Sequence, residues 1–301
     1  MTSPTKQVAH NIQHRITDEI FNALGWSTTG LLRRALGPLF GLPTRRFAHI
    51  FARADVEVGL GGMNRGCRSA MNDFAIELAV RGNETVPTDG PLLVVSNHPG
   101  AYDSICLAAS VPRPDIKIVV FDTPVYHATP NAERCFLCVT RDPAQRMTAL
   151  KGVVDHLHAG GSLLQFGSGT IDPDPAISNL SEDELQKWSP SLEIMLRKAP
   201  DTRLVLAVVS GVVLKRFAEH PLTRLRRTPL EVRRLAEFIQ VIQHLLRPDS
   251  VKIQAHLSFA PPVTLETLQG ESGGGRLLPV ILARERALMA EHRQVFGLTH
   301  T

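Results

Sequence analysis

The sequence predicts an α/β fold, in which a largely parallel sheet is flanked by helices and preceded by a helical N-terminal region. From about residue 90 onward, short apolar runs bounded by turn residues alternate with stretches of helical periodicity. Such alternation is typical of strand–helix–strand units that build a parallel sheet. Before residue 82 the apolar residues recur at helical spacing, and turn-forming residues at Gly82, Asn83 and 87–91 follow. We therefore expect a helical region over 1–82 and an α/β domain over 83–301, which at 43% hydrophobic content can bury one large core.

The individual elements follow from local patterns. Apolar or alternating runs predict strands over 92–95, 115–121, 163–166, 204–213 and 252–259. Helices are predicted after Asp103, from Pro143 to a Gly160-Gly161 stop, from Pro229 to Pro248, and over 279–295. Capping boxes at 181–184 and 228–231 mark further helix starts.

The stretch after the first of these strands carries the most specific chemistry. Leu92 to Val95 leads directly into His98, at the carboxyl end of a strand, where ligand crevices of open α/β sheets lie. Pro99 and Gly100 predict a turn, and Asp103 is expected to be the N-cap of the next helix. An aspartate turned back onto one imidazole nitrogen leaves the other nitrogen free to take a proton from a hydroxyl. The alternative is a loop histidine beside an aspartate that merely caps a helix.

The residues around His98 favour the first interpretation. Ser96-Asn97-His98, followed after four residues by Asp103 and Ser104, resembles the first motif of the lysophospholipid and glycerol-phosphate acyltransferase superfamily, to which bacterial 1-acylglycerol-3-phosphate acyltransferases belong. Arg141 is similar to the arginine of its second motif. Residues 166–170 look like the third motif, with Ser168 in place of a glutamate and Ile171 in place of an arginine. The strand expected over 204–213 stands where the fourth motif falls, without its proline.

The resemblance implies a reaction and a set of site residues. Members of this superfamily transfer an acyl chain from a thioester of coenzyme A or acyl carrier protein to a hydroxyl, which implies His98 as base and Asp103 as its orienter. It also implies substrate contacts at Asn97, Arg141, Gly167, Ser168, Gly169 and Thr170. No metal or cofactor is implied, because the thioester is a co-substrate. The changes at Ser168 and Ile171 leave the acceptor open, so that another hydroxyl or an amine is also compatible.

Two further function classes remain open on sequence grounds. One is a catalytically silent lipid-binding relative, because the third motif is altered. The other is an acyl thioester hydrolase, in which water replaces the lipid acceptor. The intact pair of His98 and Asp103 weighs against the silent relative.

The charge distribution indicates anionic partners. The net charge is +4, and residues 215–234 hold seven basic side chains against two acidic ones. Such a cluster suits anionic lipid, coenzyme A phosphates or the acidic face of a carrier protein, although a solvated helix flank has the same composition. Nucleic acid is disfavoured, because few aromatic residues accompany the arginines and no binding motif appears.

The N-terminal region predicts a membrane surface contact. An apolar stripe at helical spacing is accompanied by arginines; its members are Leu31, Leu32, Ala35, Leu36, Leu39 and Phe40. Such a helix lies in a membrane interface or packs on the domain. No signal peptide or spanning stretch is seen, so we expect a cytoplasmic protein, peripheral on the inner membrane face. The four cysteines do not define a disulfide framework, and we expect Cys135 and Cys138 to be small buried residues rather than metal ligands.

Overall fold

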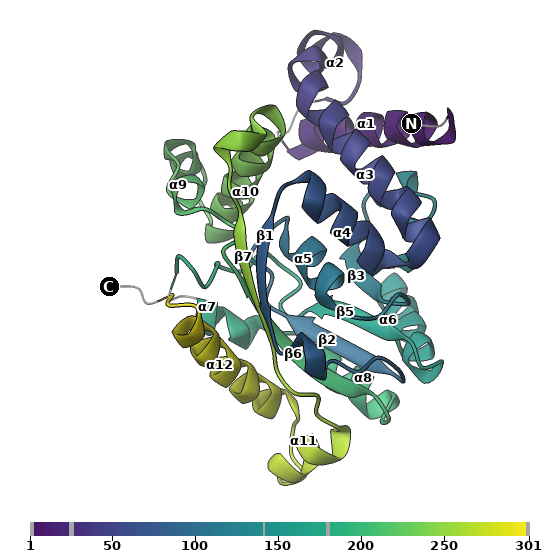
Figure 1. Cartoon of the computed structure of the whole chain (residues 1–301), viewed down its shortest axis with the longest axis vertical. Helices are drawn as coiled ribbons and strands as arrows, with labels where there is room; N and C mark the ends of the chain where they lie inside the picture. Colours follow the sequence, from purple (N-terminus) through teal and green to yellow (C-terminus); the bar gives the residue numbers. More distant parts are fainter. Residues whose placement is uncertain (1–2, 24–26, 141, 179–180, 299–301) are drawn as a thin grey trace.

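The computed structural model describes residues 3–23, 27–140, 142–178 and 181–298. Its centre is a seven-stranded sheet in the order β1-β7-β6-β2-β5-β3-β4, and all neighbours are parallel except β6 and β7 (Figure 1). The predicted fold class, a largely parallel sheet flanked by helices, is confirmed. The strands are β1 (Glu77–Arg81), β2 (Leu92–Ser96), β3 (Lys117–Phe121), β4 (Phe136–Val139), β5 (Ser162–Phe166), β6 (Arg203–Ser210) and β7 (Gln254–Phe259).

Helices precede the sheet, connect its strands and close the chain. The α-helices are α1 (Ser3–Ala23), α2 (Gly30–Leu36), α3 (Gly41–Gly61), α4 (Met63–Asp73), α5 (Asp103–Ser110), α6 (Pro143–His158), α7 (Ser181–Glu184), α8 (Ser191–Lys198), α9 (Lys215–Ala218), α10 (Pro229–Leu246), α11 (Leu265–Glu271) and α12 (Leu278–Val295). The 3₁₀ turns are η1 (Gly37–Phe40), η2 (Asn83–Thr85), η3 (Tyr126–Ala128), η4 (Ala132–Cys135), η5 (Leu185–Lys187), η6 (Pro221–Leu225) and η7 (Pro248–Ser250). Within the described ranges, no helix carries an apolar stretch of the length needed to cross a bilayer.

Strand β2 lies in the middle of the sheet and is buried on both faces. Because side chains alternate along a strand, Leu92 and Val94 pack into one apolar cluster, and Leu93 and Val95 pack into another on the opposite face. All five residues of β2 are buried. A strand covered on both faces reads as a continuous apolar run, which is why the sequence predicted it.

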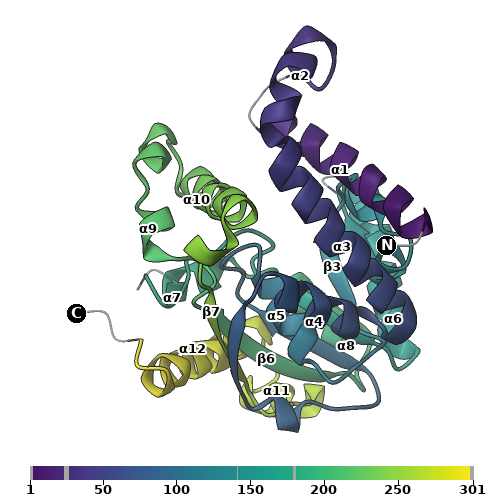
Figure 2. The same ribbon diagram turned by 45° about the horizontal axis from the view of Figure 1, so that its top comes forward.

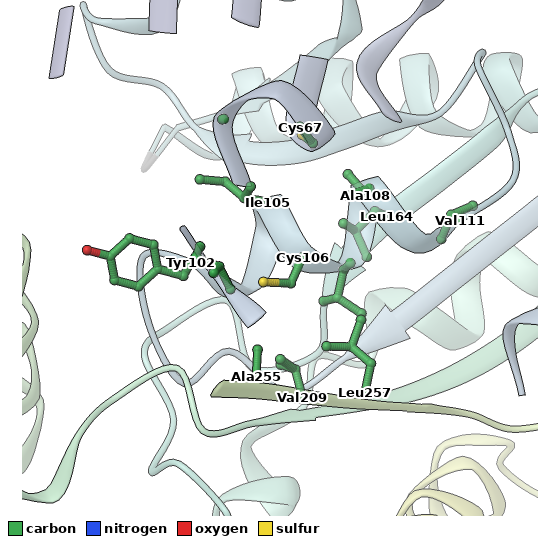
Figure 3. Packing of buried hydrophobic residues seen from close by; sticks show 14 of the residues in the cluster. Cys67, Tyr102, Ile105, Cys106, Ala108, Val111, Leu164, Val209, Ala255 and Leu257 are labelled. Carbon is green, nitrogen blue, oxygen red and sulfur yellow. The ribbon is translucent and has the colours of Figure 1, made fainter. Parts of the chain in front are cut away.

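The N-terminal helices share the core of the α/β domain. Helix α5 lies between α4 and the sheet, where Ile105 and Cys106 are buried with Cys67 of α4 and with Val209, Ala255 and Leu257 of β6 and β7 (Figure 3). The Tyr102 hydroxyl lies 2.8 Å from Nδ1 of His244 on α10, and its ring packs edge-on against that of Phe74. Strand β1 precedes the boundary expected near residue 82, yet it is the edge strand of the sheet.

Three local details differ from expectation. Strand β6 ends at Ser210, three residues short of the expected end, because the chain turns at Gly211 with a φ of 74°. Cys135 and Cys138 are half-buried instead of buried, because β4 is the other edge of the sheet. Helix α5 begins with Asp103 itself, and its N-cap is Tyr102. The expected N-cap role of Asp103 is therefore wrong; its carboxylate serves the neighbouring histidine.

Candidate active site

The candidate residues directly follow the carboxyl end of β2, which lies between β5 and β6 in the sheet. Asn97 follows directly and is 1% exposed. Its side-chain amide donates to the Val209 carbonyl at 2.9 Å and accepts from the Val209 N–H at 2.9 Å. The amide thus continues the β2–β6 pairing beyond the last backbone bond. This clamp fixes where the next residue, His98, leaves the sheet, and a contact of Asn97 with substrate stays a prediction.

His98 and Asp103 form the pair that the sequence predicts. Nδ1 of His98 lies 2.7 Å from Oδ2 of Asp103, whose side chain is fully buried. The Gly100 N–H donates to the same oxygen at 2.9 Å, and the Ser104 N–H donates to the other. These bonds hold the carboxylate in one orientation, so that it fixes the tautomer and plane of the imidazole.

The other side of the imidazole is open. The ring stacks on Phe166 with centroids 4.1 Å apart and an interplanar angle of 18°, and the His98 side chain is 25% exposed. None of the described residues forms a hydrogen bond with Nε2. A hydroxyl that approaches Nε2 meets an imidazole held in place by Asp103 at Nδ1 and by the stacked ring of Phe166.

The electrostatics of His98 reflect opposing effects. Burial lowers its pKa, whereas the Asp103 carboxylate, followed by those of Glu237 and Asp172, raises the pKa to about 9. The proton is therefore retained at neutral pH in the unliganded protein. Only an imidazole that has lost this proton can accept another one.

Two aspartates follow the third motif: Asp172 anchors the loop of His98, and Asp174 anchors the turn after β6. Asp172 accepts a hydrogen bond from the His98 N–H at 2.9 Å and returns one from its own N–H to the His98 carbonyl at 2.7 Å. Asp174 is 3% exposed and accepts from the N–H groups of Ala176, Gly211, Val212 and Val213. The sequence indicated only a rigid loop for these residues. Their anchoring role depends on contacts with segments far away in the chain.

A third carboxylate that the sequence did not single out faces this loop. Glu237 on α10 is half-buried, and its carboxyl carbon lies 4.0 Å from the position that a Cβ on Gly100 would take. Burial raises the pKa of Glu237 to about 7, although the positive charge of His98 lowers it. The helical pattern of 229–247 predicted α10 but gave no sign that one of its glutamates meets the loop after β2.

Comparison with known proteins places this geometry in a family. Residues 77–212 match the family model described as Acyltransferase. The match covers the segment from β1 to the turn after β6 and leaves the helices on either side of it unmatched. The matched segment holds β1, the His98 loop and β5, and it confirms the resemblance to the acyltransferase superfamily. A search of curated proteins found no match.

Several solved structures resemble this chain, and one of them has low sequence identity to it. It is described as the crystal structure of the 1-acyl-sn-glycerophosphate (LPA) acyltransferase, PlsC, from Thermotoga maritima. The two chains are 14% identical with a TM-score of 0.43, over 80% of this chain and 79% of the other.

The segment that resembles the third motif forms a tight turn after β5. Gly167 is buried against Trp188, and a Cβ at this position would lie 2.1 Å from the indole. The Ser168 hydroxyl donates to the Thr170 carbonyl at 2.8 Å, so it stabilises its own turn. Gly169 has a φ of 65°, and Gly169 and Thr170 are exposed. Contacts of this turn with substrate stay predictions, and Arg141 of the second motif lies outside the described residues.

Three glycine N–H groups in the turns around His98 already have acceptors within the chain. That of Gly100 bonds Asp103, that of Gly167 bonds the Ser96 carbonyl, and that of Gly169 bonds the Phe166 carbonyl. These three N–H groups are therefore not available to bind a developing oxyanion.

One group of side chains has donor atoms close enough to share a cation. Among the described residues these are Asp122, His127 and Cys138, at the ends of β3 and β4. His127 already has its two ring nitrogens 2.8 Å from Asp122 and 2.7 Å from Glu133. These carboxylates raise the pKa of His127, because each accepts a hydrogen bond from the charged ring. A protonated histidine between two carboxylates accounts for the arrangement without an ion.

Proposed function

We propose that this protein transfers a fatty acyl group from an acyl-CoA or acyl-carrier thioester to a hydroxyl of a lysophospholipid or related lipid, with His98 as general base. The observation that carries the proposal is the His98–Asp103 pair, with Nδ1 held at 2.7 Å and Nε2 open, inside an acyltransferase-family domain. No metal or cofactor takes part in the proposed reaction.

The proposed reaction needs no acyl-enzyme. Nε2 of neutral His98 accepts the proton of the acceptor hydroxyl while the hydroxyl oxygen attacks the thioester carbonyl carbon. The tetrahedral intermediate collapses with cleavage of the C–S bond. The leaving thiolate then takes the proton from the imidazolium, so that the products are an ester and a free thiol. Asp103 stabilises the imidazolium between the two proton transfers.

A small apolar cavity offers room for a short apolar part of a substrate, not for a whole long acyl chain. It has a volume of about 110 Å³ and lies between the N-terminal helices and the α5 side of the sheet. Phe47, Phe51, Ile105, Tyr126 and Phe136 are among its lining residues. A hydrocarbon chain is stabilised in such surroundings by about 0.8 kcal/mol per buried CH₂.

The acceptor contact proposed here differs from that implied by the third motif. Ser168 lacks a carboxylate and uses its hydroxyl within its own turn. Glu237 offers a carboxylate from α10, beside the same loop as His98. We assign Glu237 the task of accepting a hydrogen bond from a hydroxyl or amine of the acceptor.

Membrane contact through the N-terminal region is part of the proposal. Leu39 and Leu42 are 70% and 50% exposed, close in sequence to the basic residues Arg45 and Arg46. The side chains of Leu31, Leu32 and Leu36, from the same predicted stripe, lie outside the described part. We propose a cytoplasmic protein that is peripheral on the inner membrane face, where its lipid acceptor resides.

The proposal is tested by incubating the protein with acyl-CoA or acyl carrier protein, with and without lysophospholipid, and measuring free thiol and acylated lipid. We expect thiol release that requires lipid and is abolished in His98→Ala. Release without lipid contradicts acyl transfer and identifies a thioester hydrolase. No turnover with either donor identifies a lipid-binding relative. Full activity of His98→Ala refutes the assignment of the base.

A further inference from the structure

A rigid tip between α9 and α10 presents apolar side chains to solvent. We call residues 221–227, which comprise η6 and the two arginines after it, the η6 tip. Leu222 is 50% exposed and Leu225 is 75% exposed. Two large aliphatic side chains so close together on one short turn are costly in water unless a partner covers them.

Hydrogen bonds hold the backbone of the η6 tip in place. The His220 ring accepts from the Leu222 N–H, and the Thr223 hydroxyl donates to the His220 carbonyl at 2.6 Å. Thr223 itself is 4% exposed, and Phe217 just before the tip is 2% exposed. The two leucines are thus exposed on an anchored turn, and their exposure follows from the fold of that turn.

Arginines surround these leucines. Arg224, Arg226 and Arg227 are all exposed. The nearby carboxylates are largely engaged: Glu219 pairs with Lys215 at 3.7 Å, and Glu231 accepts from Thr228 in a capping box. Arg226 lies close enough to Glu231 to lower the pKa of this carboxyl. Among the described residues, no carboxylate forms an ion pair with Arg224 or Arg227.

We propose that the η6 tip docks on an anionic lipid bilayer, with Leu222 and Leu225 entering the interface and the arginines binding lipid phosphates. Exposed aliphatic side chains flanked by arginines match a bilayer, in which anionic headgroups cover an apolar layer of acyl chains. The acidic face of a carrier protein explains the arginines but leaves the leucines in water. This inference rests on the proposed function in one respect: a lipid acceptor lies in the bilayer, so docking brings the protein to its substrate.

The position of the η6 tip relates docking to the candidate site. Helix α10 begins directly after the tip and carries Glu237, which faces Gly100 in the His98 loop. In both Figure 1 and Figure 2, α9 and the start of α10 lie toward the same end of the molecule as α2, away from α11 and α12.

The experiment measures binding of the full chain to sedimented vesicles of phosphatidylcholine alone and of phosphatidylcholine with phosphatidylglycerol. We expect binding that needs the anionic lipid and falls about tenfold or more in Leu222→Ser/Leu225→Ser, from the lost apolar burial. Arg224→Ala/Arg227→Ala should weaken binding to the anionic vesicles and reduce its dependence on salt. Met147→Ser is the matched control, because Met147 is 65% exposed on α6, outside the tip, and should bind as the unaltered chain does.

Separate readouts distinguish failure of docking from failure of the proposed function. His98→Ala should bind vesicles normally, and the tip variants should keep their activity on a short-chain, water-soluble acceptor. Equal vesicle binding by the leucine variant and the unaltered chain overturns the proposal. The proposal is also overturned if the arginine variant loses binding to acyl carrier protein but still binds vesicles. The η6 tip would then bind a carrier protein instead of a bilayer.

Discussion

We expect the raised pKa of His98 to make the rate of the proposed acyl transfer strongly dependent on pH. With a pKa of about 9, only about 1% of the imidazole is neutral at pH 7, because each unit below the pKa lowers the neutral fraction about tenfold. Only neutral His98 accepts the acceptor proton. We therefore expect kcat/KM to rise about tenfold from pH 7 to pH 8, to reach half of its plateau near pH 9 and to level off above it. Between pH 7 and the plateau the deficit is about 2 to 3 kcal/mol of activation free energy.

The measurement is the initial rate of ester formation at limiting acceptor, followed by mass spectrometry at each pH. Thioester hydrolysis without protein is subtracted as the control. Glu237→Gln removes one of the carboxylates that raise the pKa of His98, so its plateau should begin at lower pH than in the unaltered chain. A rate that is already level at pH 6.5, or a Glu237→Gln profile that coincides with the unaltered one, would refute the reasoning.

Three predictions concern the supports of the site. Asp174→Ala leaves four N–H groups without their acceptor and should lower the free energy of unfolding by on the order of 3 kcal/mol or more, measured in urea; an unchanged midpoint contradicts the anchoring role. Gly167→Ala places a methyl group against Trp188 and should cost about 1–3 kcal/mol, with a shift in indole fluorescence; wild-type stability and fluorescence together would show that the turn adapts freely. His292 is buried between the hydroxyls of Ser210 and Ser258, and burial lowers its pKa to about 3. Because the unfolded chain binds this proton at higher pH, stability from His292 is present above pH 6.5 and decreases toward pH 3, by about 1.4 kcal/mol per unit, whereas His292→Gln should lack this dependence.

The sequence predicted those parts of the molecule that depend on neighbouring residues. The β2 run, the turn at Pro99 and Gly100 and the carboxylate at Asp103 lie within 12 residues, so their pattern indicated both the strand and the histidine–aspartate pair. Strand β1 was missed because it is an edge strand with alternately exposed residues and no strong apolar run.

The contacts that complete the site span larger separations. Asp172 meets His98 across 74 residues of chain, and Glu237 reaches the same loop from α10. No local spacing encodes such encounters, because they depend on the order of strands in the sheet. The N-cap prediction for Asp103 failed for a related reason: local preference favoured a cap, whereas the carboxylate is oriented toward the imidazole by tertiary structure.

The reciprocal backbone bonds between His98 and Asp172 restrict how this protein can acquire a new acceptor. The loop that begins with Gly167 ends at Asp172, whose bonds hold His98 in place. An insertion or deletion within this loop therefore displaces His98 as well. Changes of preference are therefore confined to exchanges of side chains at constant loop length, as at Ser168 and Ile171. Laboratory selection for new acceptors should accordingly yield point substitutions in this loop and reject variants of altered length.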